Sequence, residues 1–110
     1  MNPDTERLAE RVRGVIGDDP NTSERKMFGG ICFMLDGNML CGAHPKGAMF
    51  RVGKALAPEA LKIDGVTPMQ FTGRPMGGMV DVSDDCMQDD ARRRHIMQLA
   101  LAFVGALPAK

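Results

Sequence analysis

The stretch ICFMLDGNMLC, residues 31–41, decides the fold that this sequence predicts. Two apolar runs flank Asp36-Gly37-Asn38, whose Asp-Gly and Gly-Asn pairs are typical of a tight hairpin turn. We therefore expect an antiparallel hairpin of strands 31–35 and 39–41. Because the first strand has no polar alternate residue, both of its faces should be covered, one by helices and the other by a partner subunit or another element. This pattern points toward a homodimer.

The segments on either side of the hairpin carry helix and strand patterns of their own. Apolar residues recur every three or four positions in the first and last predicted helices, and glycine and proline mark the turns. In chain order the sequence predicts a helix over 4–16, a loop over 17–23, the hairpin, a strand over 49–52, a helix over 54–62, strands over 69–72 and 79–82 around a turn at 73–78, and a helix over about 87–107. The fold class is therefore α+β, with an antiparallel sheet of about five strands and the order α-β-β-β-α-β-β-α.

Length and composition limit the classes of protein to which the chain can belong. At 110 residues one hydrophobic core is the rule, so we expect a single domain over 1–110. Fourteen Lys and Arg balance 14 Asp and Glu, which leaves no net field to attract nucleic acid or an anionic membrane. With an acidic start and no run of 18 apolar residues, we expect no signal peptide, no membrane span and a cytoplasmic location. Ten methionines, with no Trp or Tyr, should fill the core or, as the alternative, form an adaptable binding surface.

Three cysteines, Cys32, Cys41 and Cys86, form no C-x-x-C pair. This number and spacing argue against a disulfide framework and against a zinc site, so we expect reduced, buried thiols. If Asp36 and Gly37 are the two turn residues, Cys32 faces Cys41 across the hairpin, and the two thiols could act as a redox switch. Two inert core cysteines are the favoured interpretation in a reducing compartment.

Arg25-Lys26-Met27-Phe28-Gly29-Gly30 combines two cations with a diglycine and could hold an anion with backbone amides and side chains. A phosphate-binding loop needs a helix after its glycines, whereas a strand follows here, so a turn with close backbone packing is the favoured interpretation. The residues that we keep as binding candidates are Arg25, Lys26, Phe28, Gly29, Gly30, Arg51 and Arg74.

Two histidines, His44 and His95, are the only imidazoles, and His44 lies close to Cys41 in the sequence. A Cys–His nucleophilic pair would need a third orienting residue and an oxyanion-binding loop, and the sequence offers neither. We therefore expect no catalytic residues. A turn histidine at the surface is the favoured interpretation of His44.

Charged clusters occur around the start of the last predicted helix. The carboxylates at positions 81, 84, 85, 89 and 90 lack the spacing of a calcium loop and fit helix capping, so we expect no metal. Arg92-Arg93-Arg94-His95 could be a nucleic-acid patch. Asp89 and Asp90 precede Arg93 and Arg94 by four positions, however, so an ion-paired, solvated face is the better interpretation.

Several of these motifs together resemble the TfoX N-terminal domain family over about residues 25–107. The resemblance rests on Lys26-Met27-Phe28-Gly29-Gly30, Phe33, Asp36-Gly37, Met49-Phe50-Arg51-Val52, Phe71 and Gly78-Met79 before an acidic turn and a long helix. It implies an α+β fold similar to secretion-chaperone-like domains and a bacterial setting. Members of the competence-regulator type carry a second, helical domain and are linked to switching on DNA-uptake genes. The resemblance implies no catalytic residues.

We expect a non-enzymatic regulatory or protein-interaction module without a cofactor. Its partner would be an unidentified protein, or a second copy of the chain, bound by an apolar sheet surface or by the Arg25-Lys26 loop. Accessory DNA binding remains an alternative if the fold gathers Arg25, Lys26, Arg51 and Arg74 on one face. A small-molecule or enzymatic role around Arg51, Arg74 and His44 is the other alternative.

Overall fold

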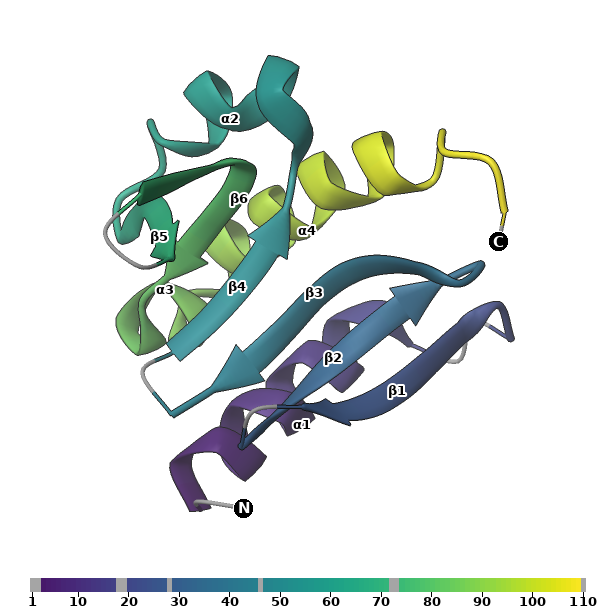
Figure 1. The fold of residues 1–110 in the computed structure, drawn as a ribbon. Helices are drawn as coiled ribbons and strands as arrows, with labels where there is room; N and C mark the ends of the chain where they lie inside the picture. The colour runs from purple at the N-terminus through teal and green to yellow at the C-terminus, as the bar shows by residue number, and fades with distance from the viewer. Residues whose placement is uncertain (1–2, 18–19, 28, 46, 72–73, 110) are drawn as a thin grey trace.

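The computed structural model describes residues 3–17, 20–27, 29–45, 47–71 and 74–109. These residues form an α+β fold with one six-stranded antiparallel sheet in the order β1-β2-β3-β4-β6-β5 (Figure 1). The elements are α1 (Pro3–Ile16), β1 (Thr22–Met27), β2 (Gly30–Leu35), β3 (Asn38–His44), β4 (Gly47–Arg51), α2 (Gly53–Ala60), β5 (Val66–Phe71), β6 (Arg74–Val82), α3 (Asp84–Gln88) and α4 (Asp90–Val104). The predicted fold class is confirmed, with six strands in place of five.

The hairpin of β2 and β3 forms as predicted, with Asp36 and Gly37 as its two turn residues. Both adopt left-handed backbone angles, with φ of 51° and 82°, which is the geometry of a type I′ turn. Leu35 pairs with Asn38 across the turn. The amide of Asp36 also donates a hydrogen bond of 2.9 Å to the carbonyl oxygen of Asn21, which joins the turn to the segment before β1.

A β-bulge changes the pairing farther along the same hairpin. Met34 pairs with Met39 and Phe33 pairs with Cys41, so Leu40 is an extra residue on β3. Cys32 consequently lies opposite Gly42, and the prediction that it faces Cys41 is wrong. Because successive residues of a strand point to opposite faces, the thiols of Cys32 and Cys41 lie on different sides of the sheet.

Two layers make up the fold, and the core lies between them. Helices α1 and α4 pack side by side on one face of the central strands, and the opposite face of β1–β4 carries no helix of the described chain (Figure 1). As predicted, α1 buries Leu8 and Val12, and α4 buries Ile96. The largest fully buried side chains of this core are Phe33, Phe50, Leu40, Met87, Ile96 and Met97.

Strand β1 falls largely inside the segment 17–23 and the cationic motif, where no strand was predicted. Its sequence, TSERKM, has no apolar alternation, because β1 is an edge strand that pairs only with β2 and leaves its charged side chains exposed. Polar and charged residues are the common means by which edge strands avoid pairing with other chains. Strand β1 accounts for the difference between the five predicted strands and the six that the structure has.

The predicted last helix is divided into α3 and α4 at Asp89, whose backbone is extended at φ −87° and ψ 116°. Ser83 caps α3 by accepting a hydrogen bond from the Cys86 amide at 3.1 Å. Asp89 caps α4 by accepting one from the Arg92 amide at 3.0 Å. Two N-caps six residues apart therefore start two helices in place of one.

The last hairpin is longer than its sequence predicted. Strands β5 and β6 include residues 66–68 and 74–78, the latter of which were predicted as a turn. Across the described residues, no helix is both long enough and apolar enough to cross a membrane.

Candidate functional site

The uncovered face of strands β1–β4 carries three methionines, Met34, Met39 and Met49, which we call the methionine face. Met79 of β6 instead lines a hollow together with α2 and Phe103. Each of the three methionines of this face belongs to a different strand of the β2-β3-β4 series. Each is partly exposed, whereas its strand neighbours on the helix-covered side are buried. The structure thus places methionines where the sequence only suggested that one side of the hairpin needs a cover.

Cross-strand pairing brings these side chains into two adjacent rows. Met34 pairs directly with Met39. Gly42 separates Cys32 from Met49 in the neighbouring row, and the Cε methyl of Met49 lies only 2.8 Å from the position that a Cβ on Gly42 would take. The methionine side chain therefore covers the backbone of β3, and the row is apolar from β2 to β4, with Arg25 of β1 opposite Cys32 at its other end. Flexible, polarisable thioethers of this kind adapt to differently shaped partners.

At its β6 side the methionine face meets a polar pair. His44 lies at the end of β3, and its Nε2 is 3.3 Å from Oδ1 of Asp81 on β6. Asp81 pairs with Met49 across β4 and β6, so this carboxylate ends the second methionine row. The apolar surface is therefore bordered at this side by an imidazole that lies beside a carboxylate.

His44 and Cys41 do not form a nucleophilic pair. They are three residues apart on one strand and so point to opposite faces. Cys41 is fully buried, and burial raises the pKa of its thiol, which keeps the sulfur neutral. Burial also raises the pKa of the Cys32 and Cys86 thiols. All three cysteines are buried and free of disulfides, as the sequence predicted.

Arg25 and Lys26 lie exposed on edge strand β1 and line a hollow of about 360 Å³ between β1 and α1. Glu6 and Glu24 line the same hollow, so carboxylates accompany its cations. Arg13 holds Glu24 with two hydrogen bonds of 2.8 Å, and this contact lowers the pKa of the Glu24 carboxyl. The anion-binding role of Arg25 and Lys26 stays a prediction.

The diglycine of the same motif has a packing function. Gly29 lies in the turn between β1 and β2, and Gly30 begins β2. A Cβ on Gly30 would lie 2.1 Å from the carbonyl oxygen of Ala43, so no larger residue fits there without a backbone shift. The remaining candidate of this motif, Phe28, lies outside the described residues.

Arg51 and Arg74 lie away from this motif. Arg51 ends β4, with its guanidinium 5.5 Å from the ring centre of Phe103, and lines a hollow of about 420 Å³ with Lys54. Arg74 begins β6, and its side chain lies outside the described part of the chain. Since β2 and β3 separate β1 from β4, the strands of Arg25 and Arg51 are about 14 Å apart. The fold does not bring Arg25, Lys26 and Arg51 together, so no observation favours the DNA-binding alternative.

The charged clusters around α4 consist of ion pairs and caps. Arg92 lies 3.3 Å from Asp89, and Asp90 lies 2.6 Å from Arg93 and 3.2 Å from Arg94. The predicted Asp90–Arg94 pair is confirmed, whereas Asp89 pairs with Arg92 because its carboxylate caps the helix at that residue. The described residues contain no group of three or more His, Cys, Asp or Glu side chains that could hold a metal ion.

A comparison with protein families supplies the identity of the domain. The model of the TfoX N-terminal domain matches residues 16–104, which is most of the chain. The chain belongs to the TfoX N-terminal domain family. All strands of this TfoX N-terminal domain lie inside the match, whereas α1 precedes it except for Ile16. Comparisons with curated proteins and with solved structures gave no match.

Proposed function

We propose that this TfoX N-terminal domain is a non-enzymatic regulatory module, of the kind expected of competence regulators, and that it acts by binding a protein partner on the methionine face. The observation that carries the proposal is the apolar, helix-free side of the sheet. Membership of the family supports a competence-regulator-like role. The separation of His44 from Cys41 and the neutral state of the buried thiols support a role without nucleophilic catalysis.

The partner presents an apolar surface with few charges. Met34 and Met39 form a directly opposed pair that offers no hydrogen-bond donor, so recognition depends on burial of apolar area. Unbranched methionine side chains repack easily, which suits a partner with a flat or slightly curved surface. A second copy of the chain is the other occupant to test, because one methionine face could pack against another about a twofold axis.

Met39→Lys tests this proposal with Leu61→Lys as its matched control. Both residues are apolar and solvent-accessible, but Leu61, with 39% of its surface exposed, follows α2 away from the methionine face. In affinity capture from a bacterial lysate, the partner should bind the native chain and Leu61→Lys and should be lost with Met39→Lys. Sedimentation velocity of the purified proteins separates a second copy from another protein. Equal capture and equal mass for all three proteins would contradict the role of the methionine face.

A further inference from the structure

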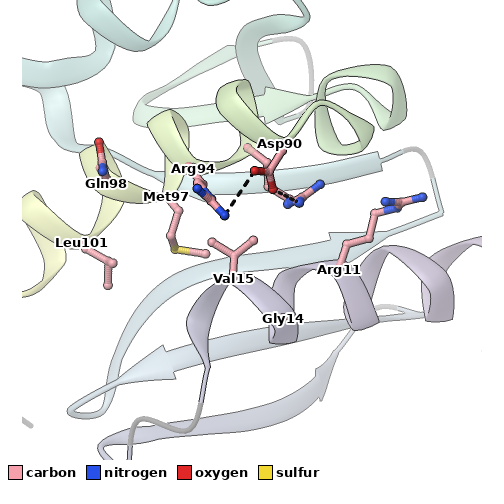
Figure 2. Close-up of a pocket in the computed structure, with 9 residues that line it drawn as sticks. Arg11, Gly14, Val15, Asp90, Arg94, Met97, Gln98 and Leu101 are labelled. Atoms are coloured by element: carbon pink, nitrogen blue, oxygen red, sulfur yellow. Dashed lines mark hydrogen bonds and ion pairs between the residues drawn. The ribbon is translucent and has the colours of Figure 1, made fainter.

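A second surface lies on the helical side of the molecule, between α1 and α4. Residues of both helices line a groove of about 550 Å³, a size typical of binding pockets (Figure 2). We call it the arginine groove, after Arg11 of α1 and Arg93 and Arg94 of α4. Since the family match begins at residue 16, the α1 wall of the groove precedes the matched region.

Helical spacing explains how the groove forms. Arg11, Gly14 and Val15 are three and four residues apart and therefore share one face of α1. Gly14 has no side chain, and a Cβ placed there would meet no atom within 4 Å. The glycine thus leaves space between two helices that otherwise pack against the same strands.

The groove has more positive than negative charge. Asp90 is its only carboxylate among the described lining residues, and this single group pairs with both Arg93 and Arg94. The side chain of Arg11 makes no hydrogen bond or ion pair to any described residue, although its Nε is buried. The Nε of Arg93 is likewise buried without a hydrogen-bond partner. Three guanidinium groups against one carboxylate leave the groove ready to accept another anion.

The opposite end of the groove carries no charged residue among the described ones: Leu101 lines it, with the amide of Gln98 beside it (Figure 2). Figure 2 shows Arg11 near one end and Leu101 near the other, with Val15 and Met97 between the helices. Met97 is buried, whereas Leu101 is 38% exposed, one of the most exposed large apolar residues described. An occupant that satisfies the whole groove therefore needs a carboxylate at one end and an apolar side chain at the other.

We propose that the arginine groove binds an acidic segment of a partner protein, with a Glu or Asp side chain on Arg11 and an apolar side chain against Leu101. Carboxylates match the planar donor geometry of guanidinium groups. A small inorganic anion would leave the Leu101 end empty, and a phosphate backbone offers no apolar group for it. The groove opens on the side opposite to the methionine face, so it forms a binding site separate from the proposed function.

A fluorescein-labelled decapeptide with four glutamates and two leucines, in a serine and glycine background, is the probe for this site. Fluorescence anisotropy at low salt should detect binding to the native chain. Replacing the glutamates by glutamine, or the leucines by serine, should weaken binding about tenfold or more. Added salt should also weaken it, because the contacts are ionic.

Protein variants then place the peptide in the groove. Arg11→Gln should weaken binding about tenfold, because it removes a guanidinium whose buried Nε has no hydrogen-bond partner among the described residues. Gly14→Gln should weaken it similarly by filling the hollow, and glutamine is a better helix former than glycine, so the fold should persist. Lys62→Gln, which removes an exposed cation outside the groove, is the control and should stay within about twofold of the native affinity.

Several results would overturn the assignment. One is an affinity for Arg11→Gln equal to that of Lys62→Gln. Others are the absence of peptide binding at millimolar protein, and equal binding of the leucine-free peptide, which would indicate a simple anion site. Amide chemical-shift changes in labelled protein provide a second measurement: shifts confined to α1 and α4 support the groove, whereas shifts on β2–β4 contradict it. Met39→Lys should leave peptide binding unchanged, so the two surfaces are tested independently.

Discussion

Replacing Gly14 by alanine should stabilise the protein by about 1 kcal/mol. Gly14 lies in the last turn of α1, where glycine costs up to about that much relative to alanine, because the unfolded chain is more flexible at glycine. The new methyl group would contact no atom within 4 Å, so no steric cost opposes the gain. For a domain of this size, 1 kcal/mol corresponds to a rise of about 4 °C in Tm.

Gly53→Ala is the matched comparison, and it should act in the opposite direction. Gly53 begins α2 with φ of 79°, a conformation that costs an L-residue about 1–2 kcal/mol. Its added Cβ would lie 2.4 Å from Cδ1 of Phe103, and such overpacking costs about 1–3 kcal/mol. Together these two terms predict a loss of roughly 3 kcal/mol.

Urea unfolding and thermal melts of the two variants measure both effects on one scale. The expected difference between Gly14→Ala and Gly53→Ala is about 4 kcal/mol. A Gly14→Ala protein that is less stable than the native chain would refute the reasoning, because it would mean that the space beside Gly14 is occupied. The arginine groove would then lose the open wall on which the peptide proposal depends.

Three further predictions concern titration and capping. Burial raises the pKa of the Cys41 thiol, so the free energy of unfolding should fall above pH 8.5, where the thiol ionises only in the unfolded chain. Measured by urea unfolding, Cys41→Ala should make this fall less steep by up to about 1.4 kcal/mol per pH unit. Equal pH dependence in the two proteins would exclude the effect. The hydrogen bond from Arg13 lowers the pKa of Glu24, so this contact stabilises the fold above pH 4.5 and loses its effect as the pH falls through the lowered pKa. In thermal melts over a pH series, Glu24→Gln should therefore reduce the fall of Tm in acid. An unchanged acid profile would contradict this prediction. Ser83→Ala should cost about 1 kcal/mol in urea unfolding by removing the α3 cap, and an unchanged midpoint would show that the cap contributes nothing.

The parts of the fold that local chemistry determines were predictable from the sequence. Asp36-Gly37 specifies its turn because Gly tolerates positive φ freely and Asp tolerates it better than most residues, and the structure has this turn. The first helix was predictable because its apolar spacing matches one buried stripe. Both signals depend only on residues close in the chain.

Features set by distant contacts were not predictable in the same way. Strand β1 has no apolar pattern, because its one neighbour is β2 and its side chains remain in water. The carboxylates up to Asp90 were interpreted as caps of one helix, because nothing in the sequence separates a first-turn carboxylate from the N-cap of a second helix. Only the extended backbone at Asp89 distinguishes them.

The candidate surfaces were predictable to different degrees. The missing polar alternation of residues 31–35 predicted a cover on both faces of the hairpin. Helices α1 and α4 cover one face, and a cover on the other face stays a prediction. The arginine groove was missed, because Arg11 and Arg94 belong to helices far apart in the sequence. The one local signal was Gly14, because a glycine inside an amphipathic helix indicates a gap in the helix surface. The sequence pattern does not tell which other element lies beside that gap.

A single extra residue, Leu40, links the core of this domain to its methionine face. Because the bulge lies between the Met34–Met39 pair and the Phe33–Cys41 pair, both Leu40 and Cys41 are fully buried. A regular hairpin would instead pair Cys32 with Cys41. The side chains on one strand beyond this point would then lie on the opposite face of the sheet. The bulge thus places Cys32 opposite Gly42, where Met49 covers the bare backbone, and it keeps the open side of the sheet apolar and free of a thiol pair. The same bulge therefore removes the Cys32–Cys41 contact that sequence spacing predicted and shapes the methionine face, which is the proposed binding surface.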